Sequence, residues 1–100
     1  MIMIYCPFPS KGEARKVAKL LLNEKSIVCA NIFPVNSIYR WKDKIEDTEE
    51  HALIAKTNKT KAESAIKTLK KEHSYDTPAI ISWEAGSNRR YAKWMEKELE

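Results

Sequence analysis

Few side chains in this sequence could bind a metal ion or act as a nucleophile. Those that stand out are the thiols of Cys6 and Cys29, the imidazole of His73, and a run of carboxylates in residues 46–50. A thiolate together with an imidazole suits a soft or borderline ion such as copper better than magnesium or calcium. The carboxylates could hold a hard cation, but no glycine-containing calcium loop accompanies them, and a charge run is usually a solvated face. What the thiols and the imidazole can do therefore depends on the elements that position them.

The apolar pattern and the helix-capping residues predict four strands and three helices. Ser10 with Glu13, and Thr60 with Glu63, have the spacing of a capping box, so each pair should begin a helix. Asn88 should cap a third helix. The expected strands are residues 1–6, 27–41, 51–56 and 79–83, and the expected helices are residues 10–25, 60–73 and from 88 onward.

Residues 27–57 are expected to form a long β-hairpin, whose chain reverses at residues 42–44. Pro34 and Asn36 interrupt its first strand, where we expect a bend or a bulge. The outer part, from about residue 36 to residue 50, has few core residues, and a two-stranded hairpin is marginally stable by itself. We therefore expect this part to lie against another chain, with Tyr39 and Trp41 packed on a partner rather than stacked on nucleic acid bases.

The order of elements predicts an α+β fold of the ferredoxin-like βαββαβ type, with an antiparallel sheet, both helices on one sheet face, and an added C-terminal helix. Residues 1–100 should form a single domain. The expected strand order is fourth, first, third, second. Charges usually prevent edge pairing, but residues 37–41 of one edge strand carry only Arg40, so pairing between subunits is expected.

This strand order also predicts where the thiols lie. Cys6 ends the first strand at the end of the sheet to which the second helix returns with His73, so the two side chains should be neighbours. Cys29 lies two strands away, which is about 10 Å from the spacing of adjacent strands. Because that distance exceeds the reach of a disulfide, we expect two free thiols and no ion shared by Cys6 and Cys29 within one chain.

Composition excludes several classes of protein. The 18 Lys and Arg against 14 Asp and Glu give a net charge of +4, too mild to imply a nucleic acid partner. Six lysines in residues 56–71 nevertheless leave a possible phosphate-binding helix face. No apolar stretch reaches the length of a membrane span, and residues 1–6 do not read as a secretory signal. Two free thiols are typical of a reducing compartment, so a cytoplasmic protein is expected.

Enzymatic activity finds little support in these residues. A cysteine nucleophile needs a base and a group that orients the base, and no glycines that could form an oxyanion hole surround Cys6. The only glycines are Gly12 and Gly86, so there is no glycine-rich phosphate loop. We expect no enzyme and no catalytic residues, although a reaction through Cys6 stays an open hypothesis.

Along nearly its whole length the chain resembles the CutA family, the divalent-cation tolerance proteins. The matching stretches are Cys29-Ala30-Asn31-Ile32, Ser37-Ile38-Tyr39-Arg40-Trp41, Lys44 with Ile45-Glu46, Ile54-Ala55-Lys56-Thr57, His73-x-Tyr75-x-x-Pro78 and Tyr91-x-x-Trp94. The chain departs from the family pattern at Asp43, where a glycine is usual, and at Ser74, where a proline is usual. The turn of the hairpin and the loop after His73 are therefore expected to differ in detail.

The resemblance implies a homotrimer joined through its sheets and an association with copper and other divalent metal ions. It places the metal ligands at Cys6, Glu72 and His73, with a glutamate where the family has a second histidine. It also implies an architecture similar to the trimeric PII signalling proteins. The alternative function is therefore a PII-like signalling or adaptor trimer, in which clefts between subunits receive a small ligand or a protein.

Overall fold

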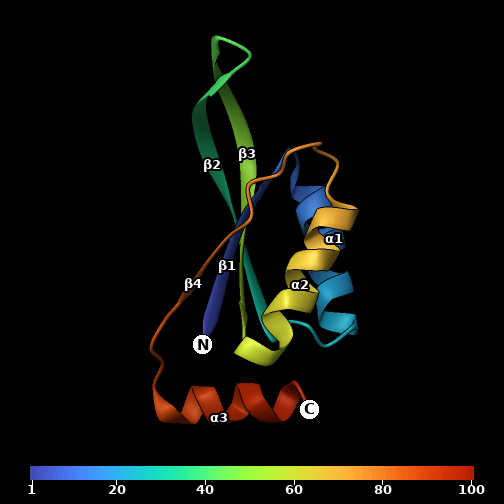
Figure 1. Ribbon diagram of the computed structural model, residues 1–100, viewed down its shortest axis with the longest axis vertical. Coiled ribbons are helices and arrows are strands. Elements are labelled where there is room, and N and C mark those ends of the chain that lie inside the picture. Colours follow the sequence, from blue (N-terminus) through green and yellow to red (C-terminus); the bar gives the residue numbers. More distant parts are fainter.

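A computed structural model of the protein describes all 100 residues as four strands and three helices (Figure 1). In chain order these are β1 (Ile2–Phe8), α1 (Lys11–Asn23), β2 (Cys29–Trp41), β3 (Lys44–Thr57), α2 (Lys59–Glu72), β4 (Ile81–Glu84) and α3 (Arg89–Glu98). The strands form one antiparallel sheet in the order β2-β3-β1-β4. This confirms the predicted α+β fold and the predicted strand order.

The core lies between the sheet and the two helices that cover one of its faces, α1 and α2 (Figure 1). Ile4, Cys6 and Phe8 alternate along β1 and point into this core, as the two-residue period of a strand requires. The opposite face of the sheet carries no helix layer (Figure 1). No helix is long and apolar enough to span a membrane. The fully buried apolar residues are Ile4, Cys6, Phe8, Ala14, Leu21, Ala52, Leu53, Ala55, Ala65 and Leu69.

The first strand continues two residues beyond its predicted end at Cys6. Pro7 pairs with Ala52, and Phe8 pairs with His51, in unbroken register with β3. The neighbour on the other side, β4, pairs only as far as Tyr5. Pro7 therefore sits where β1 has a single neighbour, a position that tolerates the missing backbone N–H of proline.

The hairpin is continuous, so the predicted bulge at Pro34 and Asn36 is wrong. Every residue of β2, from Cys29 opposite Lys56 to Trp41 opposite Lys44, pairs with β3 in one register. Because β2 is an edge strand, a proline can be accommodated in it without loss of pairing. The chain reverses at residues 42 and 43, within the predicted turn, and both have positive φ, 48° and 64°. This is the conformation of a two-residue hairpin turn, which aspartate tolerates.

The third strand begins at residue 44, seven residues before its predicted start. Only its residues 51–57 pair with β1. Residues 35–50 consequently form a two-stranded extension of the sheet, called the arm below, which projects beyond the rest of the molecule (Figure 1). The molecule extends 45 Å along its longest axis but only 24 Å and 20 Å across.

Only one of the two predicted capping boxes begins a helix. Ser10 caps α1, and its Oγ accepts a hydrogen bond of 3.2 Å from the backbone N–H of Glu13. The prediction for α2 was wrong, because Asn58 is its N-cap and accepts a bond of 2.9 Å from the N–H of Lys61. The helix therefore starts directly after β3, and Thr60 lies inside its first turn.

We predict that Asn58→Ala lowers the free energy of unfolding by about 1 kcal/mol, because it removes the partner of a helix N-terminal N–H. Thr60→Ala is the matched control and should change the free energy of unfolding by much less. Urea denaturation followed by circular dichroism compares the two. A larger loss in Thr60→Ala than in Asn58→Ala would contradict this assignment of the cap.

Candidate functional site

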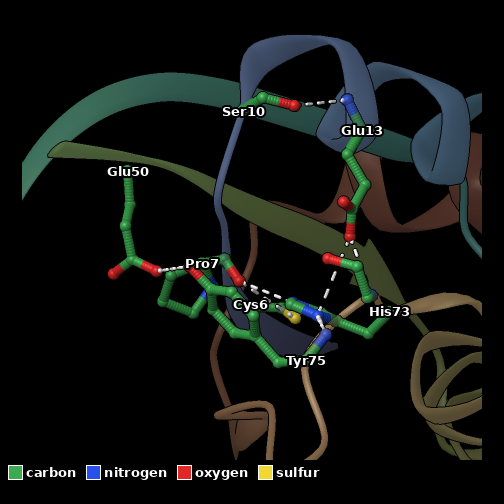
Figure 2. A network of polar contacts seen from close by, with 8 residues as sticks. Cys6, Pro7, Ser10, Glu13, Glu50, His73 and Tyr75 are labelled. Atoms are coloured by element: carbon green, nitrogen blue, oxygen red, sulfur yellow. Dashed lines mark hydrogen bonds and ion pairs between the residues drawn. The ribbon is translucent and has the colours of Figure 1, made fainter. Parts of the chain in front are cut away.

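The end of β1 and the end of α2 meet, as the strand order predicted. His73 is the C-cap residue of α2, and its imidazole stacks on the ring of Phe8 with centroids 4.3 Å apart. Its Nε2 lies 2.7 Å from the carbonyl oxygen of Pro7, the residue after Cys6 (Figure 2). Cys6 and His73 therefore occupy one buried neighbourhood under the first turn of α1.

The hydrogen bonds of His73 fix its protonation pattern. A carbonyl oxygen only accepts, so Nε2 carries the proton and donates it to Pro7. The other nitrogen, Nδ1, accepts a bond of 3.1 Å from the backbone N–H of Tyr75. Nδ1 also lies 3.8 Å from Oε2 of Glu13. In this conformation both ring nitrogens are used within the chain, and neither offers a lone pair to a metal ion.

The thiol of Cys6 also lies in the interior of the protein. It is fully buried, and burial, followed by the nearby charges of Glu13 and Glu50, raises the pKa of Cys6 to about 12. At neutral pH it is a protonated thiol, whereas the thiolate is the form that binds metal or attacks a carbon atom. Because the thiol is protonated at neutral pH, the hypothesis of catalysis through Cys6 is weakened as well.

Glu72, the third predicted ligand, ends α2 and forms no hydrogen bond or ion pair with Cys6 or His73. No group of three His, Cys, Asp or Glu side chains in the structure could hold a metal ion. The ligand set Cys6, Glu72 and His73 therefore does not fit a metal ion in this arrangement. It stays a prediction that requires these side chains to move.

Cys29 lies in a different part of the structure, as predicted, and both cysteines are free thiols. Its Sγ is 3.9 Å from Nζ of Lys56, the residue opposite it on β3. Tyr91 of α3 is also close, since burial and then the Cys29 thiol raise the pKa of this tyrosine. No group of three side chains that could bind a metal ion surrounds Cys29.

A polar network that the sequence did not reveal holds the loop after α2 in place (Figure 2). Tyr75 donates from its hydroxyl to Oε2 of Glu50 at 2.7 Å, and Glu50 is only 6% exposed. Burial and then this bond raise the pKa of Tyr75, so the phenol stays a donor. The N–H of Ser74 donates to Glu13 at 3.0 Å. The prediction of a solvated face for residues 46–50 was therefore wrong for Glu50.

A groove of about 910 Å³ opens between the arm and the loop after α2. Three carboxylates and three aromatic rings contribute to its walls, and none of its lining residues is basic. No local pattern of residues indicates this groove, because it forms between the hairpin and a loop about 30 residues later in the chain. The lining residues are Pro7, Asn36, Ser37, Ile38, Tyr39, Trp41, Glu46, Glu50, Ser74, Tyr75, Asp76, Thr77 and Ala79.

Comparison with known proteins gives a consistent picture. Residues 2–98 match the family model described as CutA1 divalent ion tolerance protein. The divalent-cation tolerance protein CutA of Thermococcus kodakarensis is 39% identical over 99 residues, which cover 98% of this chain and 95% of that protein. The crystal structure of CutA1 from Pyrococcus horikoshii, also 39% identical, superposes with a TM-score of 0.94 and covers 98% of this chain and 97% of its own. A PII-like protein CutA from Nostoc sp. PCC 7120 in apo form is 26% identical, with a TM-score of 0.93 over 100% of this chain and 98% of its own.

The burial of Cys6 predicts an unreactive thiol in the folded protein. In a Cys29→Ser variant, alkylation of Cys6 at pH 8 should be slower than that of an ordinary cysteine by about a thousandfold, from the thiolate fraction alone. In denaturant the same thiol should react at the ordinary rate, which serves as the internal control. Rapid alkylation of the folded variant would contradict the buried position of Cys6.

Proposed function

The chain belongs to the CutA1 divalent ion tolerance family, and from this premise we propose that it is a homotrimer that binds a divalent metal ion, copper in particular. Membership of this family supports a role in divalent-cation tolerance. The trimer, the copper ion and its ligands are the parts that we propose. We also propose a cytoplasmic location, which the two free cysteines support.

The exposed apolar side chains of the arm carry the proposal of a trimer. Ile38 is 69% exposed and Ile45 is 71% exposed, and Trp41 at the tip is 46% exposed. The β4 strand at the other edge adds Ile81 and Trp83, which are also exposed. Large apolar surfaces of this kind are typical of interfaces between subunits. A neighbouring subunit that covers the arm would remove this surface from water.

Both edges of the sheet support the same assembly. The first edge is β2, along its whole length, and the second edge is β4. Unpaired backbone groups at an edge can be satisfied by a strand of another chain. Because the sheet face away from α1 and α2 also has no helix layer (Figure 1), three copies joined through their sheets would cover both kinds of surface.

For copper we propose Cys6 and His73 as ligands, with Glu72 as a third. The meeting of β1 and α2 supports this choice, as does the preference of thiolate and imidazole for soft ions. Binding requires His73 to release either Pro7 or Tyr75, and Cys6 to lose its proton. Copper affinity should therefore fall at acidic pH, where protons compete for these groups.

The PII-like alternative has an observation of its own in its favour. The groove beside the arm is of a size typical of sites for small molecules, whereas Cys6 and His73 are buried. In this alternative the ligand enters a cleft between subunits and the thiol takes no part. Substitution of Cys6 separates the two functions. The copper proposal expects this substitution to abolish copper binding, whereas the PII-like alternative assigns no role to the thiol.

The exposed apolar side chains of the arm lead us to predict a trimer. Wild-type protein should sediment as a trimer at micromolar concentration, and Trp41→Lys should dissociate it, because a lysine at this position places a charge in the interface. Leu20→Lys is the matched control: Leu20 is 38% exposed on α1, away from the arm, and the same change there should leave the trimer intact. Sedimentation equilibrium that finds a wild-type monomer would contradict the proposal.

Copper binding should depend on the thiol and the imidazole. Calorimetry on wild type, Cys6→Ser and His73→Ala should show affinity weakened in each variant by at least roughly a hundredfold, because loss of residues that only support metal ligands already costs up to about that much. Cys29→Ser is the control and should bind as wild type does. If Cys6→Ser and His73→Ala both bind copper as tightly as wild type, the ligands lie elsewhere, and the carboxylates of residues 46–50 become the better explanation.

A further inference from the structure

Glu50 is a buried carboxylate without a cationic partner. It is only 6% exposed, and its one protein hydrogen bond comes from the neutral hydroxyl of Tyr75. The one ion pair between charged side chains, Lys59 with Glu84, does not include it, and neither does the 3.8 Å contact of the His73 ring with Glu13. Buried carboxylates are normally paired with a positive charge, because removal from water is otherwise costly.

The surroundings of Glu50 concentrate negative charge. The groove that it lines also contains the carboxylates of Glu46 and Asp76, and it contains no lysine, arginine or histidine. Elsewhere the chain is rich in basic residues, with 18 Lys and Arg in all. Thr48 lies between Glu46 and Glu50 on the same strand face, and its buried Oγ1 has no hydrogen-bond partner. A cleft lined by charges of one sign attracts ligands of the opposite sign.

The walls of the groove favour an organic cation over a bare metal ion. Tyr39, Trp41 and Tyr75 line it, and aromatic rings attract ammonium and guanidinium groups through their faces. The carboxylates do not converge into a group that could hold a metal ion. The volume of about 910 Å³ is large for a single ion and ordinary for a small molecule.

We propose that the groove binds a small organic cation, with a primary ammonium or guanidinium group paired to the carboxylate of Glu50. Tyr75 holds one oxygen of this carboxylate at 2.7 Å and so orients the other toward the ligand. Glu46 and Asp76 receive a second positive group farther out. A small organic cation would be the ligand in the PII-like alternative described above. This inference rests on the proposed trimer, because a neighbouring subunit would close the groove beside Tyr39 and Trp41.

The same chemistry could come from a lysine or arginine of the neighbouring subunit, and the experiment separates the two sources. Agmatine and spermidine are titrated into the wild-type protein by calorimetry, while sedimentation records the assembly state of the same sample. We expect saturable binding of one cation per chain. A diol of the same length as agmatine, without charge, should not bind. Magnesium should not compete at equal concentration.

Two variants make the test specific. Glu50→Gln should weaken binding of agmatine by roughly tenfold or more, since it removes the buried partner of the charge, and it should remain a trimer. Glu49→Gln is the matched control, because it removes the same charge from an exposed neighbouring residue; it should bind as wild type does.

Three results would overturn the proposal. The first is a wild-type trimer that binds neither cation at millimolar concentration. The second is displacement of agmatine by magnesium with the same dependence on Glu50, which would make the groove a metal site. The third is dissociation of the trimer by Glu50→Gln, which would show that a neighbouring subunit supplies the positive group. A wild-type monomer that still binds agmatine through Glu50 would instead contradict the proposed trimer and leave the cation site standing.

Discussion

The strands of the sheet differ in length, and this difference determines which part of the sheet is left uncovered. β1 has seven residues, whereas β2 and β3 have 13 and 14, so the hairpin continues after its neighbour in the sheet has ended. The arm keeps its backbone hydrogen bonds within the β2–β3 pair but has neither a third strand nor a helix to cover its side chains. Isolated two-stranded structure is marginally stable in water. Its apolar residues therefore make sense as a surface for another subunit.

The point where β1 ends is also where the polar network lies. Glu13 of α1, His73 at the end of α2, and Glu50 of β3 hold the loop that follows α2 through backbone and side-chain bonds. This network positions Tyr75 and thereby forms one wall of the groove. It also uses both nitrogens of His73. The structural role of His73 thus competes directly with a role as a metal ligand, and the same residue cannot serve both in one conformation.

Local signals predicted much of the fold. Ser10 at the start of α1, the apolar run of β1 and the alternation of helices and strands were sufficient for the strand order, and the strand order was sufficient to bring Cys6 near His73. The errors arose where tertiary context decides. Pro34 is compatible with unbroken pairing because β2 is an edge, and Asn58 caps α2 because β3 ends directly before it. Neither fact is visible in the residues alone.

The candidate site was less predictable than the fold. Glu50 belongs to a charge run that reads as solvated, yet a tyrosine 25 residues later in the chain bonds to it and buries it. The groove likewise needs the arm and the loop after α2 to lie side by side, and no local pattern specifies that. The spacing of His73 and Tyr75 was seen only as part of a family motif. Its physical meaning is that one residue accepts a bond from the backbone of the other.

Amide hydrogen exchange along the arm tests the central claim, that a second subunit covers residues 35–50, most directly. The amides of β2 that point away from β3 have no partner within the chain, since β2 is the edge of the sheet. We predict that these amides exchange slowly in the wild-type protein at micromolar concentration, as amides of the core do. Exchange at the rate of solvent-exposed amides would show that the arm stands free in water, and would contradict the account.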